Sequence, residues 1–74
     1  MDMFYINYYL QYCAKAYPFL QINAKWNLCG LYMTIQIKHK NKYSFYLADF
    51  SAEDEQDAIN KISFCISDFL AKGA

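Results

Sequence analysis

The sequence contains no arginine, and this absence limits the kind of partner that the protein can bind. Seven lysines balance seven acidic residues over 74 residues, so the formal net charge is zero. A chain of this charge lacks the broad basic field that draws a protein non-specifically onto nucleic acid. Only a local basic patch is compatible with these counts.

Cysteine and histidine are too few for a familiar metal or redox site. The three cysteines, Cys13, Cys29 and Cys65, match neither a disulfide framework nor the paired ligands of a zinc site. His39 is the single histidine, which excludes a multi-histidine metal site within one chain. We therefore expect reduced cysteines, no cofactor, no small-molecule substrate and no enzymatic activity.

Long apolar runs are also missing. No stretch approaches the length that spans a bilayer, and the first residues lack the basic flank and apolar run of a signal peptide. We expect an intracellular protein, in the nucleus or the cytoplasm, without membrane contact. A hydrophobic share of 57%, with 20% aromatic residues, is enough for a small core without disulfides or metal.

Two segments have the spacing of apolar residues that is typical of a helix. The first covers about residues 4–17, with Asp2 as the expected cap and Pro18 as its end. The second reaches Ala71, and Ser51 is its expected cap because an acidic residue follows three positions later. The expected buried faces comprise Ile6, Leu10, Cys13 and Tyr17 in the first helix and Ala58, Ile62, Cys65 and Phe69 in the second.

Alternation of apolar and polar residues predicts three strands between the helices. They cover residues 20–27, 31–38 and 43–48, with turns at 27–30 and 40–42, and form an antiparallel meander. In the second strand, Met33, Ile35 and Ile37 are expected to point inward. Two helices and three strands fit best as an α+β domain with both helices packed on one face of the sheet. The opposite face is left to water or to a partner. We expect it to show Tyr32, Thr34, Gln36, Tyr46 and Ala48.

The order of elements and two short segments resemble the double-stranded RNA-binding domain. Residues 10–15, Leu-Gln-Tyr-Cys-Ala-Lys, are similar to the end of the first helix in the amino-terminal domain of the RNA helicase A and maleless proteins. Asp57-Ala58, with Ile62 and Phe69-Leu70 downstream, resembles that family's second helix. The resemblance implies one α-β-β-β-α domain over residues 1–74. It also implies RNA contacts through the first helix, the first interstrand loop and a basic start of the second helix.

Two of these implied contacts depart from the family pattern. The loop at 27–30 lacks the family's glycine-proline-x-histidine pattern, and acidic residues surround the place where the family has two lysines before Asp57. Carboxylates there repel phosphate. The degenerate RNA-contact positions are Glu53, Asp54, Glu55 and Gln56. We expect weak or absent duplex-RNA binding, and the possible residual contacts are Lys15, Lys38, His39, Lys40 and Lys42.

The first hypothesis is a non-catalytic protein-protein interaction module, an adaptor in an RNA-related complex that pairs with itself or with another such domain. The edge of the third strand offers unpaired backbone groups that Lys42 and Asp49 protect only partly. Exposed aromatic side chains are typical of interfaces. The predicted partner-binding residues are Tyr5, Tyr8 and Tyr12 on the first helix and Tyr32, Thr34, Gln36 and Tyr46 on the sheet.

Other interpretations stay open at this point. The tyrosines could form a partly buried helix flank, the outer sheet face could be covered by water, and the hairpin lysines could be a solvated loop tip. The chain could also be a weak or non-standard double-stranded RNA-binding domain, or a small inhibitor of viral or mobile-element origin. A binding domain and an inhibitor obey the same surface physics.

Overall fold

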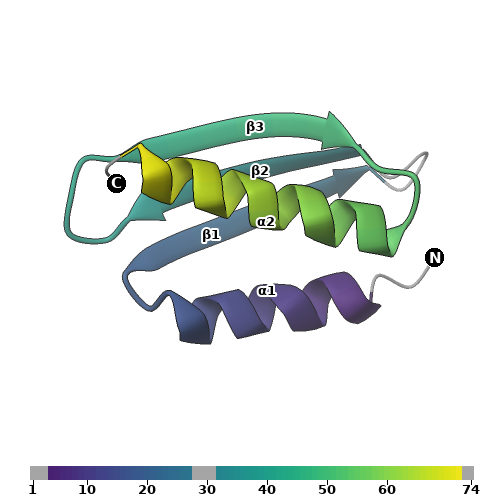
Figure 1. The fold of residues 1–74 in the computed structure, drawn as a ribbon, viewed down its shortest axis with the longest axis horizontal. Coiled ribbons are helices and arrows are strands. Elements are labelled where there is room, and N and C mark those ends of the chain that lie inside the picture. The colour runs from purple at the N-terminus through teal and green to yellow at the C-terminus, as the bar shows by residue number, and fades with distance from the viewer. Residues whose placement is uncertain (1–3, 28–31, 73–74) are drawn as a thin grey trace.

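A computed structural model describes residues 4–27 and 32–72. In this part of the chain the elements are α1 (Phe4–Ala16), β1 (Leu20–Asn27), β2 (Tyr32–His39), β3 (Phe45–Ser51) and α2 (Glu55–Ala71). The predicted α+β class and α-β-β-β-α order are confirmed (Figure 1). Within the described residues, neither helix is long and apolar enough to cross a membrane. The expected cap Asp2 and the turn residues 28–30 lie outside the described residues.

The strands form one antiparallel sheet in the order β1-β2-β3. Its helix-facing side is apolar because the register places Ile22 opposite Ile37, and Ile35 opposite Ala48. Both helices pack against this side, as predicted (Figure 1). The buried core comprises Ile6, Cys13, Leu20, Met33, Ile35, Ile37, Ala58, Ile62, Cys65, Ile66 and Phe69.

The strand boundaries differ from the prediction most clearly at β3. This strand was expected over residues 43–48 but covers Phe45–Ser51, since Ser51 still pairs with Tyr32 of β2. Ser51 is therefore a strand residue, and its prediction as a helix cap is wrong. Asp54 caps α2 instead: it has an extended backbone, and its carboxylate accepts a hydrogen bond from the Asp57 N–H at 2.8 Å.

Tyr46 and Ala48 were predicted on the outer face of the sheet, and this prediction is wrong. The register pairs Tyr46 with Ile37 and Ala48 with Ile35. Since Ile35 and Ile37 are buried beneath the helices, Tyr46 and Ala48 also face the helices. The Tyr46 ring contacts the Phe69 ring edge-on at 6.0 Å, and its hydroxyl donates to Asp68 Oδ2 at 3.2 Å. Apolar residues occur on both faces of β3, so alternation alone does not decide which set is buried. Contact with α2 selects Tyr46, Ala48 and Phe50.

Candidate interaction surfaces

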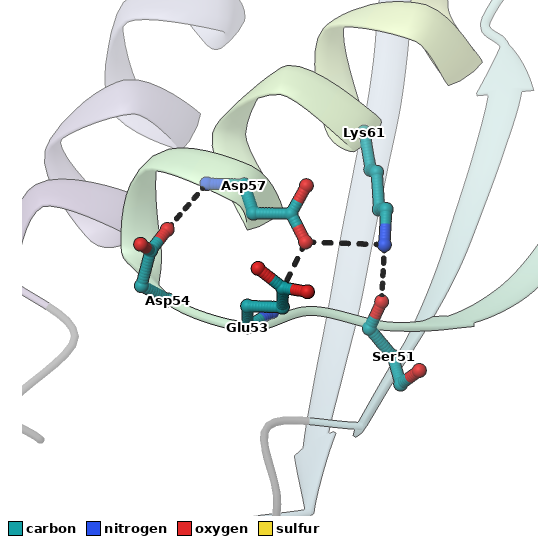
Figure 2. A network of polar contacts seen from close by, with 5 residues as sticks. All are labelled: Ser51, Glu53, Asp54, Asp57 and Lys61. Atoms are coloured by element: carbon teal, nitrogen blue, oxygen red, sulfur yellow. Dashed lines mark hydrogen bonds and ion pairs between the residues drawn. The ribbon is translucent and has the colours of Figure 1, made fainter.

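The resemblance implies a phosphate contact at the start of α2. There, carboxylates of the protein itself bind backbone N–H groups and Lys61 in one network (Figure 2). Asp57 Oδ2 accepts from the Glu53 N–H at 3.0 Å and lies 3.1 Å from Lys61 Nζ. Lys61 Nζ also donates to the Ser51 carbonyl oxygen at 2.5 Å. The hydrogen bond from the Glu53 N–H lowers the pKa of the Asp57 carboxyl group below its ordinary value, and Lys61 adds a smaller effect in the same direction. This network ties the last residue of β3 to the first turn of α2.

Glu55 has a second structural role, which sequence reasoning missed. Its Oε2 accepts hydrogen bonds from the backbone N–H groups of Tyr5, at 2.9 Å, and Ile6, at 3.2 Å. These groups belong to the first turn of α1, which contains no acidic residue of its own. Glu55 therefore caps α1 across 50 positions of sequence, and no local pattern signals such a pair.

The four residues predicted to be degenerate RNA-contact positions thus divide into two kinds. Asp54 and Glu55 use their carboxylates to accept backbone N–H groups of the protein itself. Glu53 and Gln56 are exposed, and the Gln56 amide donates a hydrogen bond to Asn60 on the next turn. A helix start attracts an anion through unsatisfied N–H groups and its positive dipole. Here carboxylates already occupy that environment.

The three predicted tyrosines of α1 are largely exposed. Tyr5, Tyr8 and Tyr12 keep 65%, 67% and 59% of their surface open. Tyr12 stacks on Tyr9 with the ring centroids 6.1 Å apart. Tyr8 and Tyr12 line a shallow depression with Gln11 and Lys15, which lies in the last turn of α1. The helix therefore presents aromatic rings beside a single cation.

The outer face of the sheet contains two apolar residues that the sequence analysis did not place there. Phe45 and Leu47 of β3 are 57% and 58% exposed, because the pairing of β3 with β2 turns their side chains away from the helices. Tyr32 is also exposed, as predicted, and Thr34 donates to Asp49 Oδ1 at 2.6 Å. The i, i+2 spacing shows that Phe45 and Leu47 share one face of the strand, but it does not show that this face is the exposed one.

The β2–β3 hairpin keeps its positive charge available. Lys38, Lys40 and Lys42 are exposed, and the ion pairs among residues 4–27 and 32–72 involve only Lys61 and Lys72. His39 is different. Its Nδ1 accepts from the Asn41 N–H at 3.0 Å, and its ring lies 5.5 Å from the Phe19 ring. We assign His39 to closing the hairpin and the three lysines to its exposed basic surface.

The cysteines that the structure describes are core residues. Cys13 and Cys65 are free and buried, and burial raises the pKa of both thiols. A raised pKa keeps a thiol protonated and weakly nucleophilic. Cys29 lies outside the described residues. Across the described part of the chain, no group of three or more histidine, cysteine, aspartate or glutamate side chains could hold a metal ion.

Comparison of the chain with protein-family models, with curated proteins and with solved structures gave no match. Its function is therefore inferred from the exposed side chains, the charges and the strand edges described above.

Proposed function

We propose that this chain is a non-catalytic protein-interaction domain, built like a double-stranded RNA-binding domain but without that domain's main grip on duplex RNA. The observation that supports it best is the start of α2. There Asp54 and Glu55 accept the protein's own N–H groups, where the resemblance implies a pair of lysines facing phosphate.

The negative charge at the start of α2 repels the phosphates of a nucleic-acid backbone. A phosphate 4 Å from one carboxylate is repelled by roughly 4 kcal/mol at the effective dielectric of about 20 that suits a protein surface. Lys61 is the nearest cation in the network, and it is already shared between Asp57 and the Ser51 carbonyl. Screening by salt reduces the repulsion but does not turn it into attraction.

Exposed aromatic and aliphatic side chains favour a protein partner. Tyr8 and Tyr12 on α1, and Phe45 and Leu47 on β3, are each more than half exposed. Tyrosine and phenylalanine are enriched in the cores of protein interfaces, where they bury a large area with little loss of side-chain entropy. An adaptor that assembles other macromolecules needs such surfaces and no catalytic group.

A second candidate function is weak, non-standard duplex-RNA binding. It is favoured by the hairpin, whose Lys38, Lys40 and Lys42 are exposed and carry no ion pair in the described residues. Three phosphate contacts would give an RNA affinity with a salt slope of only about −3 on logarithmic scales. Affinity at physiological salt would therefore be low.

A titration with a labelled duplex of about 20 base pairs, at low and at physiological salt, separates the two functions. The decisive variant is Glu53→Lys with Gln56→Lys. It restores positive charge while keeping the two carboxylates that cap the helices. The matched control places the same added charge on the outer sheet face, as Gln21→Lys, Asn23→Lys and Gln36→Lys.

We expect the natural chain and the outer-face control to bind no duplex at physiological salt, and the helix-start variant to bind it. Thermal unfolding of each variant establishes that it is folded. Tight binding by the natural chain would overturn the proposal and assign the hairpin lysines as the RNA site. Loss of that binding in a Lys38→Ala, Lys40→Ala, Lys42→Ala variant would then verify the assignment.

A further inference from the structure

β3 is an edge strand whose outward backbone groups can be identified. In the described residues the sheet order is β1-β2-β3, so one side of β3 has no neighbouring strand. The His39 N–H donates to the Ser44 carbonyl oxygen at 3.2 Å. In an antiparallel ladder every second residue directs its backbone N–H and C=O groups to the same neighbouring strand. Tyr46 and Ala48, two and four residues after Ser44, therefore also bond toward β2. Phe45, Leu47 and Asp49 therefore direct their N–H and C=O groups to the open edge.

The two edges of the sheet are chemically different. On the outer face, β1 carries the polar, exposed residues Gln21, Asn23 and Lys25. A lysine on an edge strand discourages a further strand from pairing there. β3 instead carries the exposed apolar pair Phe45 and Leu47 on the same face. Cross-strand apolar pairs stabilise a ladder, so β3 is the edge that gains from a new neighbour.

The charges at the two ends of β3 are opposite. The hairpin before β3 carries exposed Lys40 and Lys42, whereas Asp49 lies near its end and the acidic Glu53 and Asp54 follow. If a second copy of the strand pairs antiparallel with the first, the basic end of each meets the acidic end of the other. Such complementarity accelerates encounter and fixes register. It selects a second copy of this chain as the occupant.

We propose that the chain forms a two-fold symmetric homodimer by antiparallel pairing of its β3 edges, with Phe45 opposite Leu47 of the second copy. This inference rests on the proposed interaction function and names its partner. The two three-stranded sheets join into one sheet of six strands. In each Phe45–Leu47 pair the two residues exchange both backbone hydrogen bonds.

The neighbouring registers are less favourable. Placing Leu47 opposite Leu47 of the second copy sets each Phe45 against an Asp49 carboxylate. Placing Phe45 opposite Phe45 sets each Leu47 against Tyr43, which lies before β3 begins. The ladder ends before Ser51, since Lys61 already occupies that carbonyl oxygen. The interface is consequently small, and we expect a dissociation constant of roughly 10–100 μM.

Sedimentation velocity from about 1 μM to 1 mM chain tests the dimer. The natural protein is expected to change from monomer to dimer over this range, more readily at low salt. Leu47→Lys should weaken association at least tenfold, because it places a charge in the centre of the new ladder. The matched control is Asn23→Lys on β1. Asn23 lies opposite Gln36, and Gln36 lies opposite Leu47, so the control places the same charge at the same level of the sheet but on its β1 edge.

Mixing two non-associating variants gives an independent test. Phe45→Glu with Leu47→Glu, and Phe45→Lys with Leu47→Lys, should each stay monomeric but form a heterodimer with one another. A natural chain that is monomeric at 1 mM, or a dimer that survives Leu47→Lys, would overturn homodimer formation through the β3 edge. Neither result bears on the loss of RNA binding, which the titration above decides separately.

Discussion

The two helices satisfy their first N–H groups from different sources. α2 begins with Asp54, whose carboxylate accepts the N–H of Asp57, three residues later in the same segment. α1 has no acid in its first turn and takes its acceptor from Glu55, which belongs to α2. The start of α2 can therefore form from local sequence alone, whereas the start of α1 is completed only when the helices meet.

This difference explains why so many acids gather between β3 and α2. Asp54 caps its own helix, Glu55 caps the other helix, and Asp57 binds the Glu53 N–H and Lys61. The carboxylates of Asp54, Glu55 and Asp57 therefore each have a structural partner within the chain. The helix start, where the resemblance implies an RNA contact, is thus the point that joins α1, α2 and the end of β3.

The largest effect is expected from removing the core anchor of either helix. Ile6 of α1 and Ile62 of α2 are both fully buried. Replacing either with alanine should lower the free energy of unfolding by about 2–5 kcal/mol, through lost transfer energy and the cavity left behind. Urea denaturation measures this loss, and exposed Tyr8→Ala, expected within about 0.5 kcal/mol of the natural chain, is the control.

A loss of only a few tenths of a kcal/mol for Ile6→Ala would contradict the prediction. It would show that α1 is not part of the cooperative core, and the comparison of the two helices would then concern one stable helix and one loosely attached helix.

Glu55→Ala should have the next largest effect, and should act mainly on the helix that does not contain it. The substitution leaves the Tyr5 and Ile6 N–H groups without this charged acceptor, at a cost of about 1–3 kcal/mol. Hydrogen exchange should become faster in the first turn of α1. Gln56→Ala, one residue further on, is the control. Equal effects of the two substitutions would remove Glu55 as the cap of α1.

Asp54→Ala should have a smaller and more local effect. Loss of a helix cap costs about 1 kcal/mol, and exchange should increase at the start of α2 while the first turn of α1 keeps its protection. Asp54→Ser, which retains a capping oxygen, should recover most of the stability. If Asp54→Ala exposed the start of α1 as much as Glu55→Ala does, the two caps would not be separable.

The smallest expected effect lies at the far end of α2 and depends on pH. Burial, with smaller contributions from Cys65 and Asp68, raises the pKa of Tyr46 to about 12. The folded state thus favours the neutral phenol. The stabilisation that comes from this shift in the pKa of Tyr46 is fully present below the ordinary pKa of 10.0 and is lost as the pH rises through about 12.

At neutral pH, Tyr46→Phe removes the hydrogen bond from the hydroxyl group to Asp68, a loss of about 0.5 kcal/mol. Urea denaturation between pH 7 and 11.5 should show a shallower alkaline loss of stability in this variant than in the natural chain. Parallel curves for the two proteins would contradict the assignment and would transfer the alkaline loss to Tyr9, Cys13 and Cys65, whose pKa values burial also raises.

Sequence reasoning succeeded wherever one residue period was unambiguous. The helical spacing of Ile6 and Cys13, and the alternation of Met33, Ile35 and Ile37, predicted buried positions that the structure confirms. It was wrong at β3, where Phe45 and Leu47 are as apolar as Tyr46 and Ala48. A strand with apolar residues on both faces can be read in either orientation, and the wrong choice reverses every side chain.

The sequence by itself therefore determined the order of elements, the core faces of both helices and β2, and the acidic start of α2, because these depend on residues a few positions apart. Only the tertiary structure decided which side of β3 is exposed, which residue ends that strand, and that Glu55 caps α1. These outcomes depend on contacts between residues distant in sequence, such as Tyr46 with Phe69 and Glu55 with Tyr5, which no local period encodes.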